Sequence, residues 1–124
     1  MAQTARDIAA GYWKAEGERD TEKVLAFYHK DAVFCPPGQR LVGHEQIAGF
    51  YDASAAAFPG LEAAIINDFT VGDQTALEFD AILTSVDGKK YRVLGVNIVK
   101  IREGKFESVH SYFDPNILQA EEIK

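Results

Sequence analysis

The chain has 124 residues, of which 47% are hydrophobic, so it can bury the core of one globular domain, and we expect a single domain over residues 1–124. Its formal net charge of −6, with no cluster of basic residues, argues against nucleic acid or an anionic membrane surface as a partner. No apolar run reaches the roughly 20 residues of a membrane-spanning helix, and the first residues lack a signal-peptide pattern, so we expect a cytoplasmic protein.

The first half of the chain is predicted to be mainly helical. Ile8, Tyr12 and Ala15 follow helical spacing after a possible N-cap at Thr4. Further helices are expected over residues 21–29 and 43–58, with a first strand over residues 31–35 between them, because two prolines follow that strand and Pro-Gly follows the last helix.

After Leu61 the sequence changes to the two-residue period of β-strands. Strands are predicted over residues 61–71, 75–86, 90–101 and 106–114, joined by turns at Gly-Asp, Asp-Gly and "REGK". Residues 115–124 are expected to form a short helix or a docked arm. Helices followed by an antiparallel meander define the α+β class. The sheet must curve around the N-terminal helices, which predicts a cystatin-like cone with an apolar pocket at its open end.

The sequence predicts no metal centre and no internal disulfide. His29, His44 and His110 have none of the spacings typical of zinc ligands. Cys35 is the single cysteine, and we interpret it as a small apolar side chain at the end of a strand.

Four stretches, together with the order of the elements, resemble a known family: "GERDTEKVLAFYHKDAVF", "GHEQIAGFY", "DGKKYRVLGVNIVKIREGK" and "SYFDP". The chain is similar to the SnoaL-like polyketide cyclases and the ketosteroid isomerases of the nuclear-transport-factor-like superfamily, over roughly residues 8–119. The resemblance implies the cone-shaped fold. Because this superfamily includes isomerases, dehydratases, cyclases, epoxide hydrolases and binding domains, the resemblance does not imply one activity.

The resemblance to ketosteroid isomerases implies two hydrogen-bond donors. Tyr12 stands eight residues before Asp20, where these enzymes carry the tyrosine that donates to a developing enolate oxygen. Asn97 stands nine residues after Gly88, at the position of the second donor, and an amide can fill that role. The position of the isomerase base is occupied by Pro36, which has no proton to exchange, so the match does not support steroid isomerisation.

The resemblance to other members of the superfamily indicates acidic residues as further candidates. The Arg-x-Asp of the epoxide hydrolases reads Glu78-Phe79-Asp80 here, without the arginine, and their last-strand aspartate aligns with Ser111, so that activity is not supported. The polyketide cyclases use an aspartate on the last strand, for which Asp114 is the nearest match. A second interpretation of Asp114 is a cap of the terminal turn.

The strand over residues 75–86 alternates between two faces, and the sequence leaves open which face is inside. The register implied by the resemblance turns Glu78, Asp80, Ile82 and Thr84 toward the pocket. The opposite face, with Leu77, Phe79, Ala81 and Leu83, would then be covered by a second subunit in a homodimer. In the reverse assignment the apolar face is the core and the acids are solvated. If Glu78 and Asp80 share an apolar chamber, repulsion should raise one pKa and create an acid/base near neutral pH.

These observations lead to two hypotheses for the function. In the first, a small enzyme performs cofactor-free chemistry of the cyclase, isomerase or dehydratase type on an apolar, carbonyl-bearing or polycyclic substrate. Tyr12 and Asn97 would polarise an oxygen, and Asp80 or Asp114 would move a proton. The side chains expected to contact the substrate are Trp13, Glu78, Val99, Ser111 and Phe113. In the second, the chain is a non-catalytic module that binds a small hydrophobic ligand or a protein partner.

Overall fold

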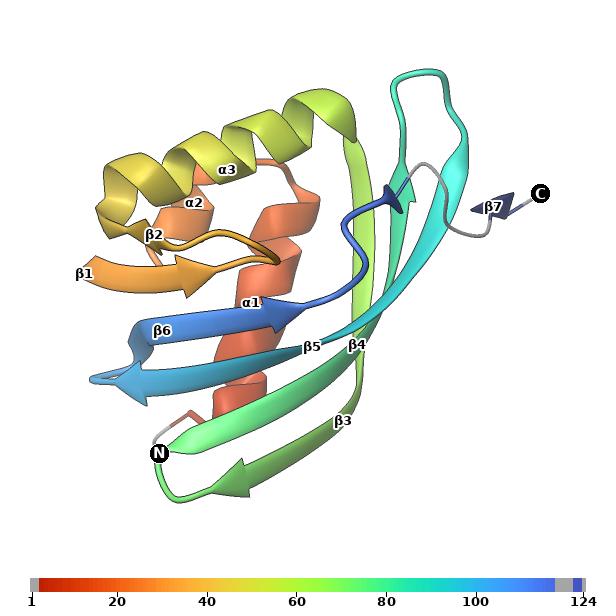
Figure 1. Cartoon of the computed structure of the whole chain (residues 1–124). Coiled ribbons are helices and arrows are strands. Elements are labelled where there is room, and N and C mark those ends of the chain that lie inside the picture. The colour runs from red at the N-terminus through yellow and green to blue at the C-terminus, as the bar shows by residue number, and fades with distance from the viewer. Residues whose placement is uncertain (1–2, 118–121, 124) are drawn as a thin grey trace.

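A curved β-sheet wraps around the helices in the computed structural model, which describes residues 3–117 and 122–123 (Figure 1). The helices are α1 (Ala5–Gly17), α2 (Thr21–Leu25) and α3 (Gly43–Ala57). The strands are β1 (Tyr28–Cys35), β2 (Leu41–Val42), β3 (Gly60–Val71), β4 (Gln74–Thr84), β5 (Lys90–Arg102), β6 (Lys105–Tyr112) and β7 (Glu122–Ile123). None of the helices in these described ranges has the length and apolar character needed to span a membrane.

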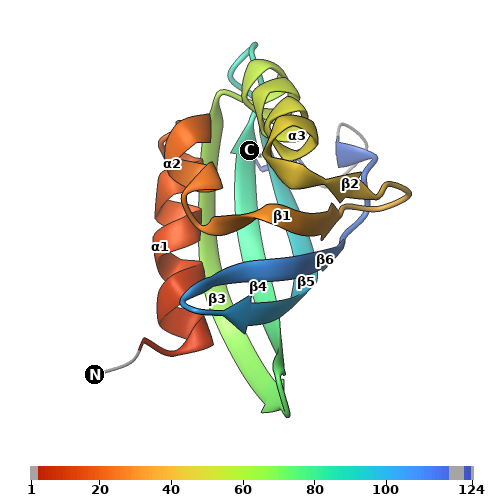
Figure 2. The ribbon, with the colours of Figure 1, turned by 90° about the vertical axis from the view of Figure 1, so that its left-hand side faces the viewer.

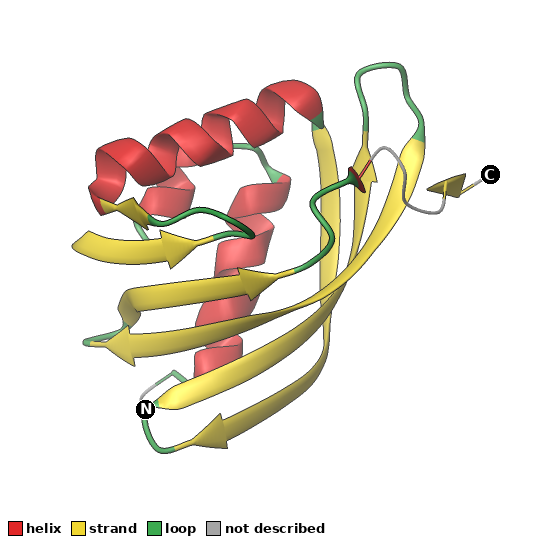
Figure 3. Cartoon of the chain, viewed as in Figure 1, coloured by secondary structure: helices red, strands yellow, loops and turns green. Residues whose placement is uncertain are grey.

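The helices lie on the concave side of the sheet (Figure 3). The strand order is β2-β1-β6-β5-β4-β3, with β7 paired to β5, and every pairing is antiparallel except that of β1 with β6. Helix α1 runs beside β3, and α3 covers β1 (Figure 2). The predicted α+β class and the curved, mainly antiparallel sheet around the N-terminal helices are therefore confirmed.

Helix α1 begins at the predicted N-cap. The Thr4 hydroxyl accepts a hydrogen bond from the Asp7 backbone N–H at 3.1 Å, and the Asp7 carboxylate accepts one from the Thr4 N–H at 3.2 Å. This capping box satisfies two backbone donors that the first turn would otherwise leave unpaired. The helix buries one face, which includes Ile8 and Tyr12, against the sheet.

Helix α2 is shorter than predicted. It ends at Leu25, whereas the sequence pattern indicated a helix to residue 29. The chain that follows Leu25 joins the sheet. The Phe27 carbonyl accepts a hydrogen bond from the Phe106 N–H at 2.7 Å, and Tyr28 pairs with Phe106. Long-range pairing therefore overrides a local helical pattern, as tertiary contacts often do.

The register between β4 and β5 decides which face of β4 is inside. Leu77 lies opposite Asn97, and direct partners in an antiparallel pair share a face. Asn97 is buried, and so is the apolar side of β4: Leu77, Phe79, Ala81 and Leu83. The expectation that Glu78, Asp80, Ile82 and Thr84 point into the pocket is wrong, because these residues alternate with the buried ones and face outward. The apolar set is the core face and is not available to a second subunit.

The C-terminal segment reaches the sheet again at β7. Glu122 pairs with Tyr91, and Ile123 pairs with Lys90. This pairing agrees with a docked arm at those two residues. The remainder of the predicted helix or arm, residues 118–121, lies outside the described residues.

Candidate functional site

A cavity of about 100 Å³ lies between α1, α3 and the concave face of the sheet. Most of its wall is apolar, and the aromatic side chains that line it are Tyr12, Trp13, Phe34, Phe50, Phe79 and Phe113. Four other polar side chains reach it: Glu16, Ser54, Asn97 and Ser111. An apolar hollow with a few convergent polar groups is the usual form of a small-molecule site.

A larger hollow of about 570 Å³ lies outside this cavity, between α3, the loop after β1 and the segment that follows β6. The two hollows share Phe50, Ser54, Phe113 and Ile117 in their walls. These shared residues therefore lie between the inner cavity and the outer hollow. Pro36, at the position of the isomerase base, lines the outer hollow and not the inner cavity.

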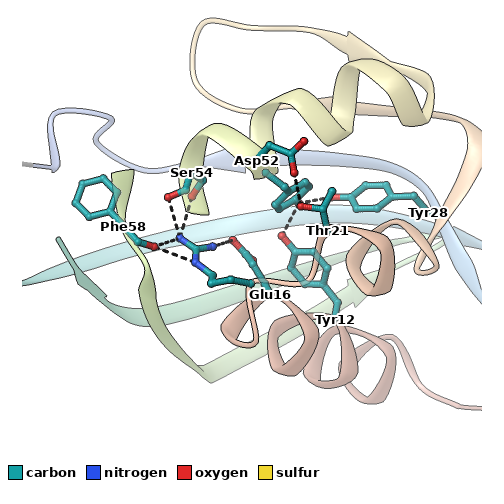
Figure 4. Close-up of polar contacts among 9 residues, drawn as sticks. Tyr12, Glu16, Thr21, Tyr28, Asp52, Ser54 and Phe58 are labelled. Atoms are coloured by element: carbon teal, nitrogen blue, oxygen red, sulfur yellow. Dashed lines mark hydrogen bonds and ion pairs between the residues drawn. The ribbon is translucent and has the colours of Figure 1, made fainter. Parts of the chain in front are cut away.

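Three buried tyrosines form a chain of hydroxyl groups beside the cavity (Figure 4). The Tyr12 Oη lies 2.5 Å from the Tyr51 Oη, which lies 2.7 Å from the Tyr28 Oη. Burial raises the pKa of all three phenols above its usual value, so they stay neutral and keep their protons. If Tyr28 donates to Tyr51 and Tyr51 donates to Tyr12, the proton of Tyr12 is left for the cavity.

The second donor, Asn97, is oriented by the neighbouring strand. Ser111 is its partner on β6, and the Ser111 hydroxyl donates to the Asn97 Oδ1 at 2.6 Å. The carbonyl end of the amide is therefore satisfied within the sheet. No described residue accepts a hydrogen bond from the Asn97 Nδ2, so both of its protons are available to a ligand in the cavity.

Glu16 is a buried carboxyl group that the sequence analysis missed. It is only 8% exposed and contributes to the cavity wall. Burial raises its pKa from the ordinary value of 4.5, while the neighbouring Tyr12 hydroxyl and the charge of Arg19 act in the opposite direction. Glu16 follows Tyr12 by four residues and therefore shares its helix face, which is the sequence signal that could have identified it.

Arg19 connects Glu16 to the end of α3. Its Nη1 lies 3.9 Å from the Glu16 Oε1. Its Nη2 donates to the carbonyl oxygens of Phe58 at 2.6 Å and Ser54 at 3.1 Å, and its Nε donates to Phe58 at 3.0 Å. A guanidinium at the C-terminal end of a helix satisfies free carbonyl groups and complements the negative end of the helix dipole. Arg19 is therefore held in place independently of Glu16.

The two acids predicted on β4 lie away from the cavity. Asp80 Oδ1 is 3.2 Å from the Arg92 Nε on the outer face, in an ion pair that lacks the alignment of a hydrogen bond. Glu78 accepts a hydrogen bond from the Asn67 side chain at 2.8 Å, also on the outer face. The interpretation of Glu78 and Asp80 as neighbours in an apolar chamber is therefore wrong.

The acid predicted at the end of β6 also lies outside the cavity wall. Asp114 is exposed, and its Oδ1 accepts a hydrogen bond from the Asn116 backbone N–H at 3.0 Å. This contact matches the alternative interpretation of Asp114 as a cap of the terminal turn.

The remaining sequence candidates separate into two groups. Trp13, Ser111 and Phe113 contribute to the cavity wall together with Tyr12 and Asn97. Val99 lies two residues beyond Asn97 on the same face of β5, but it is packed in the core and does not line the cavity.

Within the described ranges, no three His, Cys, Asp or Glu side chains are grouped as ligands of a metal ion.

Residues 9–109 match the family model of the SnoaL-like domain, so the chain belongs to the SnoaL-like family. A search of curated protein sequences found no match.

Solved structures with the same fold are only distantly similar in sequence. One is a hypothetical protein of Catenulispora acidiphila with a ketosteroid isomerase-like fold, in complex with trimethylamine: TM-score 0.80, 17% identity, covering 92% of this chain and 90% of the other. Another is TerC co-crystallised with polyporic acid: TM-score 0.78, 21% identity, 91% and 93% covered. A third is a putative SnoaL-like polyketide cyclase of Shewanella denitrificans: TM-score 0.77, 18% identity, 91% and 92% covered. At these identities the similarity establishes the fold.

Proposed function

We propose that the chain binds a small, largely apolar molecule with a carbonyl group in the inner cavity and performs cofactor-free acid/base chemistry on it. The reaction class is isomerisation, cyclisation or dehydration through an enolate. One observation carries this proposal: the Tyr12 hydroxyl and the Asn97 amide, both hydrogen-bond donors, border the same apolar hollow.

The two donors suit an oxygen that gains negative charge during a reaction. Tyr12 is supported from behind by Tyr51 and Tyr28, and Asn97 is supported by Ser111. Both donors are fixed before a ligand arrives, so they need little reorganisation as charge develops. Because apolar walls surround them, their hydrogen bonds to an enolate oxygen are stronger than they would be in water.

The structural relatives support a small molecule as the ligand. Among proteins of this fold, one was crystallised in complex with trimethylamine and another with polyporic acid. The cavity of this chain has a few polar groups, among them Tyr12, Glu16 and Asn97, in a mainly apolar wall. This arrangement favours a ligand that has one polar group on an apolar body.

A second candidate function is binding without turnover. It is favoured by Pro36 at the position where the isomerases carry their base. Asp80 and Asp114, the acids expected to move a proton, are also absent from the described wall of the cavity. In this case Tyr12 and Asn97 would hold an oxygen of the ligand without a chemical step.

The test of ligand binding uses bicyclic ketones and 4-nitrophenol, whose phenolate resembles an enolate. We expect Tyr12→Phe to weaken phenolate binding roughly 10- to 150-fold, because a hydrogen bond to a charged group contributes about 1.5–3 kcal/mol. Tyr112→Phe, an exposed tyrosine on the outer face, is the matched control and should bind as the wild type does. Equal affinity of both variants would contradict the role of Tyr12, and failure of the wild type to bind any of these compounds would contradict the proposal.

We also propose that a second copy of the chain covers the outer face of the sheet. Leu94 is 60% exposed and Tyr112 is 58% exposed on this face, where Val96 lies between them. The acidic Asp80 and the basic Arg92 flank this apolar area. Two copies related by a two-fold axis could therefore place apolar area against apolar area and acids against bases.

Sedimentation of the wild type tests the homodimer. We expect a dimer that Leu94→Asp converts to a monomer, because a charge would be buried without a partner. Val86→Asp is the matched control: Val86 is exposed in the turn between β4 and β5, beyond the outer face, and its substitution should leave the dimer intact. A monomeric wild type would contradict this proposal without affecting the assignment of the cavity.

A further inference from the structure

We infer that Glu16 is the acid/base group of the cavity, with its carboxylate taking a proton from the carbon next to the ligand's carbonyl group and later returning it. This inference rests on the proposed function and supplies the group that moves the proton.

The position of Glu16 is the first argument. Its side chain is about nine-tenths buried, and among the described residues that line the cavity it is the only one with a carboxyl group. It lies one helical turn after Tyr12 on the same face of α1, so a ligand oxygen held by the Tyr12 hydroxyl lies on the side of the helix that also carries Glu16 (Figure 4).

The surroundings of Glu16 are the second argument. The groups that act on it electrostatically are Tyr12 on its own helix, Arg19 before α2, Tyr51 on α3 and Tyr28 on β1. The tyrosines are neutral, and burial raises the pKa of the carboxyl group, which makes its ionised form a stronger base than an exposed glutamate.

Arg19 keeps the ionised form of Glu16 accessible. Its guanidinium is 3.9 Å from the carboxylate, too far for a close hydrogen-bonded pair, and its shorter contacts go to the carbonyl groups of Phe58 and Ser54. The positive charge therefore offsets part of the cost of burying the carboxylate without blocking it. Arg19 is a positioning residue in this scheme.

The proton transfer balances without a cofactor. The Glu16 carboxylate takes the proton, and the electron pair of the broken C–H bond forms a C=C bond. The π electrons of the carbonyl group move to its oxygen, which accepts hydrogen bonds from Tyr12 and Asn97. The protonated Glu16 then gives the proton to a carbon of the same molecule, and the carbonyl group is restored. Return to a different carbon of a conjugated ligand is an isomerisation.

Exchange of the α-protons of 2-indanone for deuterium in D₂O, followed by NMR, tests this step. We expect the wild type to accelerate exchange over buffer and Glu16→Gln to lower the enzyme-dependent rate roughly 10²- to 10⁴-fold, the usual contribution of a general base. Glu18→Gln is the matched control, because Glu18 is exposed beside the same helix and pairs with Lys23. Glu16→Asp keeps a carboxylate but withdraws it by one methylene, and we expect an intermediate rate.

Two further measurements separate a chemical role from a structural one. Glu16→Gln should still bind 4-nitrophenol, since Tyr12 and Asn97 are unchanged. The wild-type exchange rate should rise with pH through a midpoint above 4.5, because the raised pKa of Glu16 controls the fraction of base. That midpoint should be absent in Glu16→Gln.

The outcomes distinguish this inference from the proposed function. If Glu16→Gln exchanges protons as fast as the wild type, the inference is wrong and the cavity assignment stands. If the wild type binds 4-nitrophenol but does not accelerate exchange, the inference is wrong and the binding module is favoured. If the wild type neither binds nor exchanges, both the inference and the proposed function are wrong.

Discussion

Both faces of β4 and β5 contain polar residues, but these are buried on the inner face and reach solvent on the outer face. On the inner face, Asn97 is buried and oriented by Ser111, and it borders an apolar cavity. On the outer face, Asp80 lies next to Arg92, and Leu94 is exposed beside them. Polarity alone therefore does not mark a site in this sheet. A polar group can act on a ligand where burial removes water and fixes its direction.

Leu77 and Leu94 offer the sharpest contrast between the two faces. Leu77 is 0% exposed, and Leu77→Ala should lower the free energy of unfolding by about 2–5 kcal/mol, since a buried leucine leaves a cavity when truncated. Leu94→Ala should change it by less than about 0.5 kcal/mol in the monomer. Urea denaturation at low protein concentration measures both. Equal losses would contradict the assignment of the faces.

Gly95 tests how closely the inner face is packed. A Cβ atom added there would lie 2.6 Å from the Phe79 Cζ and 2.6 Å from the Tyr112 backbone oxygen. Gly95→Ala should therefore cost about 1–3 kcal/mol of stability, the usual effect of overpacking. Gly49→Ala is the control: an added Cβ meets nothing within 4 Å in α3, so removal of a helical glycine should stabilise the protein. A Gly95→Ala variant as stable as the wild type would show that both Phe79 and the backbone at Tyr112 can move aside.

The pH dependence of stability compares the buried acid with an exposed one. The pKa of Glu16 is raised in the folded state, so above pH 4.5 the folded protein binds its proton more tightly than the unfolded chain does. Stability must then fall as the pH rises through this window, until the folded carboxyl group has also ionised. We expect the Tm of the wild type to decrease relative to Glu16→Gln over this range. The Tm of the wild type relative to Glu18→Gln should not show this decrease with rising pH.

The smallest effect is expected for ligand affinity after a substitution on the outer face. Asp80→Asn should leave the affinity for 4-nitrophenol within about twofold of the wild type, because Asp80 pairs with Arg92 on the side of the sheet away from the cavity. Isothermal titration would detect a larger change. A strong loss of affinity would bring Asp80 back as a candidate and would contradict the register between β4 and β5.

The extent of β4 could be predicted from the sequence, but the direction of its side chains could not. The alternating pattern indicated a strand over residues 75–86, and the structure has it at Gln74–Thr84. The alternation of polar and apolar residues is a local signal, because it can be recognised from consecutive residues of one strand. The inward face depends on the pairing of Leu77 with Asn97, which local alternation does not contain. A shift of one residue exchanges the two faces, and this is how Asp80 was misassigned.

The candidate site shows the same division between local and long-range information. Tyr12 and Asn97 were found through resemblance, and Glu16 could have been found from its spacing to Tyr12 on α1. The Tyr51 hydroxyl meets those of Tyr12 and Tyr28 only because α1, β1 and α3 pack against one another. Contacts between distant elements leave no local pattern, so the tyrosine chain was not predictable from one sequence.

The parallel pairing of β1 with β6 also governs how the molecule acquires its shape. Val33 and Ser108 are partners although about three fifths of the chain separates them, so this ladder closes a very long loop. Contacts of such high sequence separation slow folding. The tyrosines come from the early part of the chain, whereas Asn97 and Ser111 come from the late part. During refolding, we therefore expect the meander to assemble first and the chamber to become competent only when the last ladder closes.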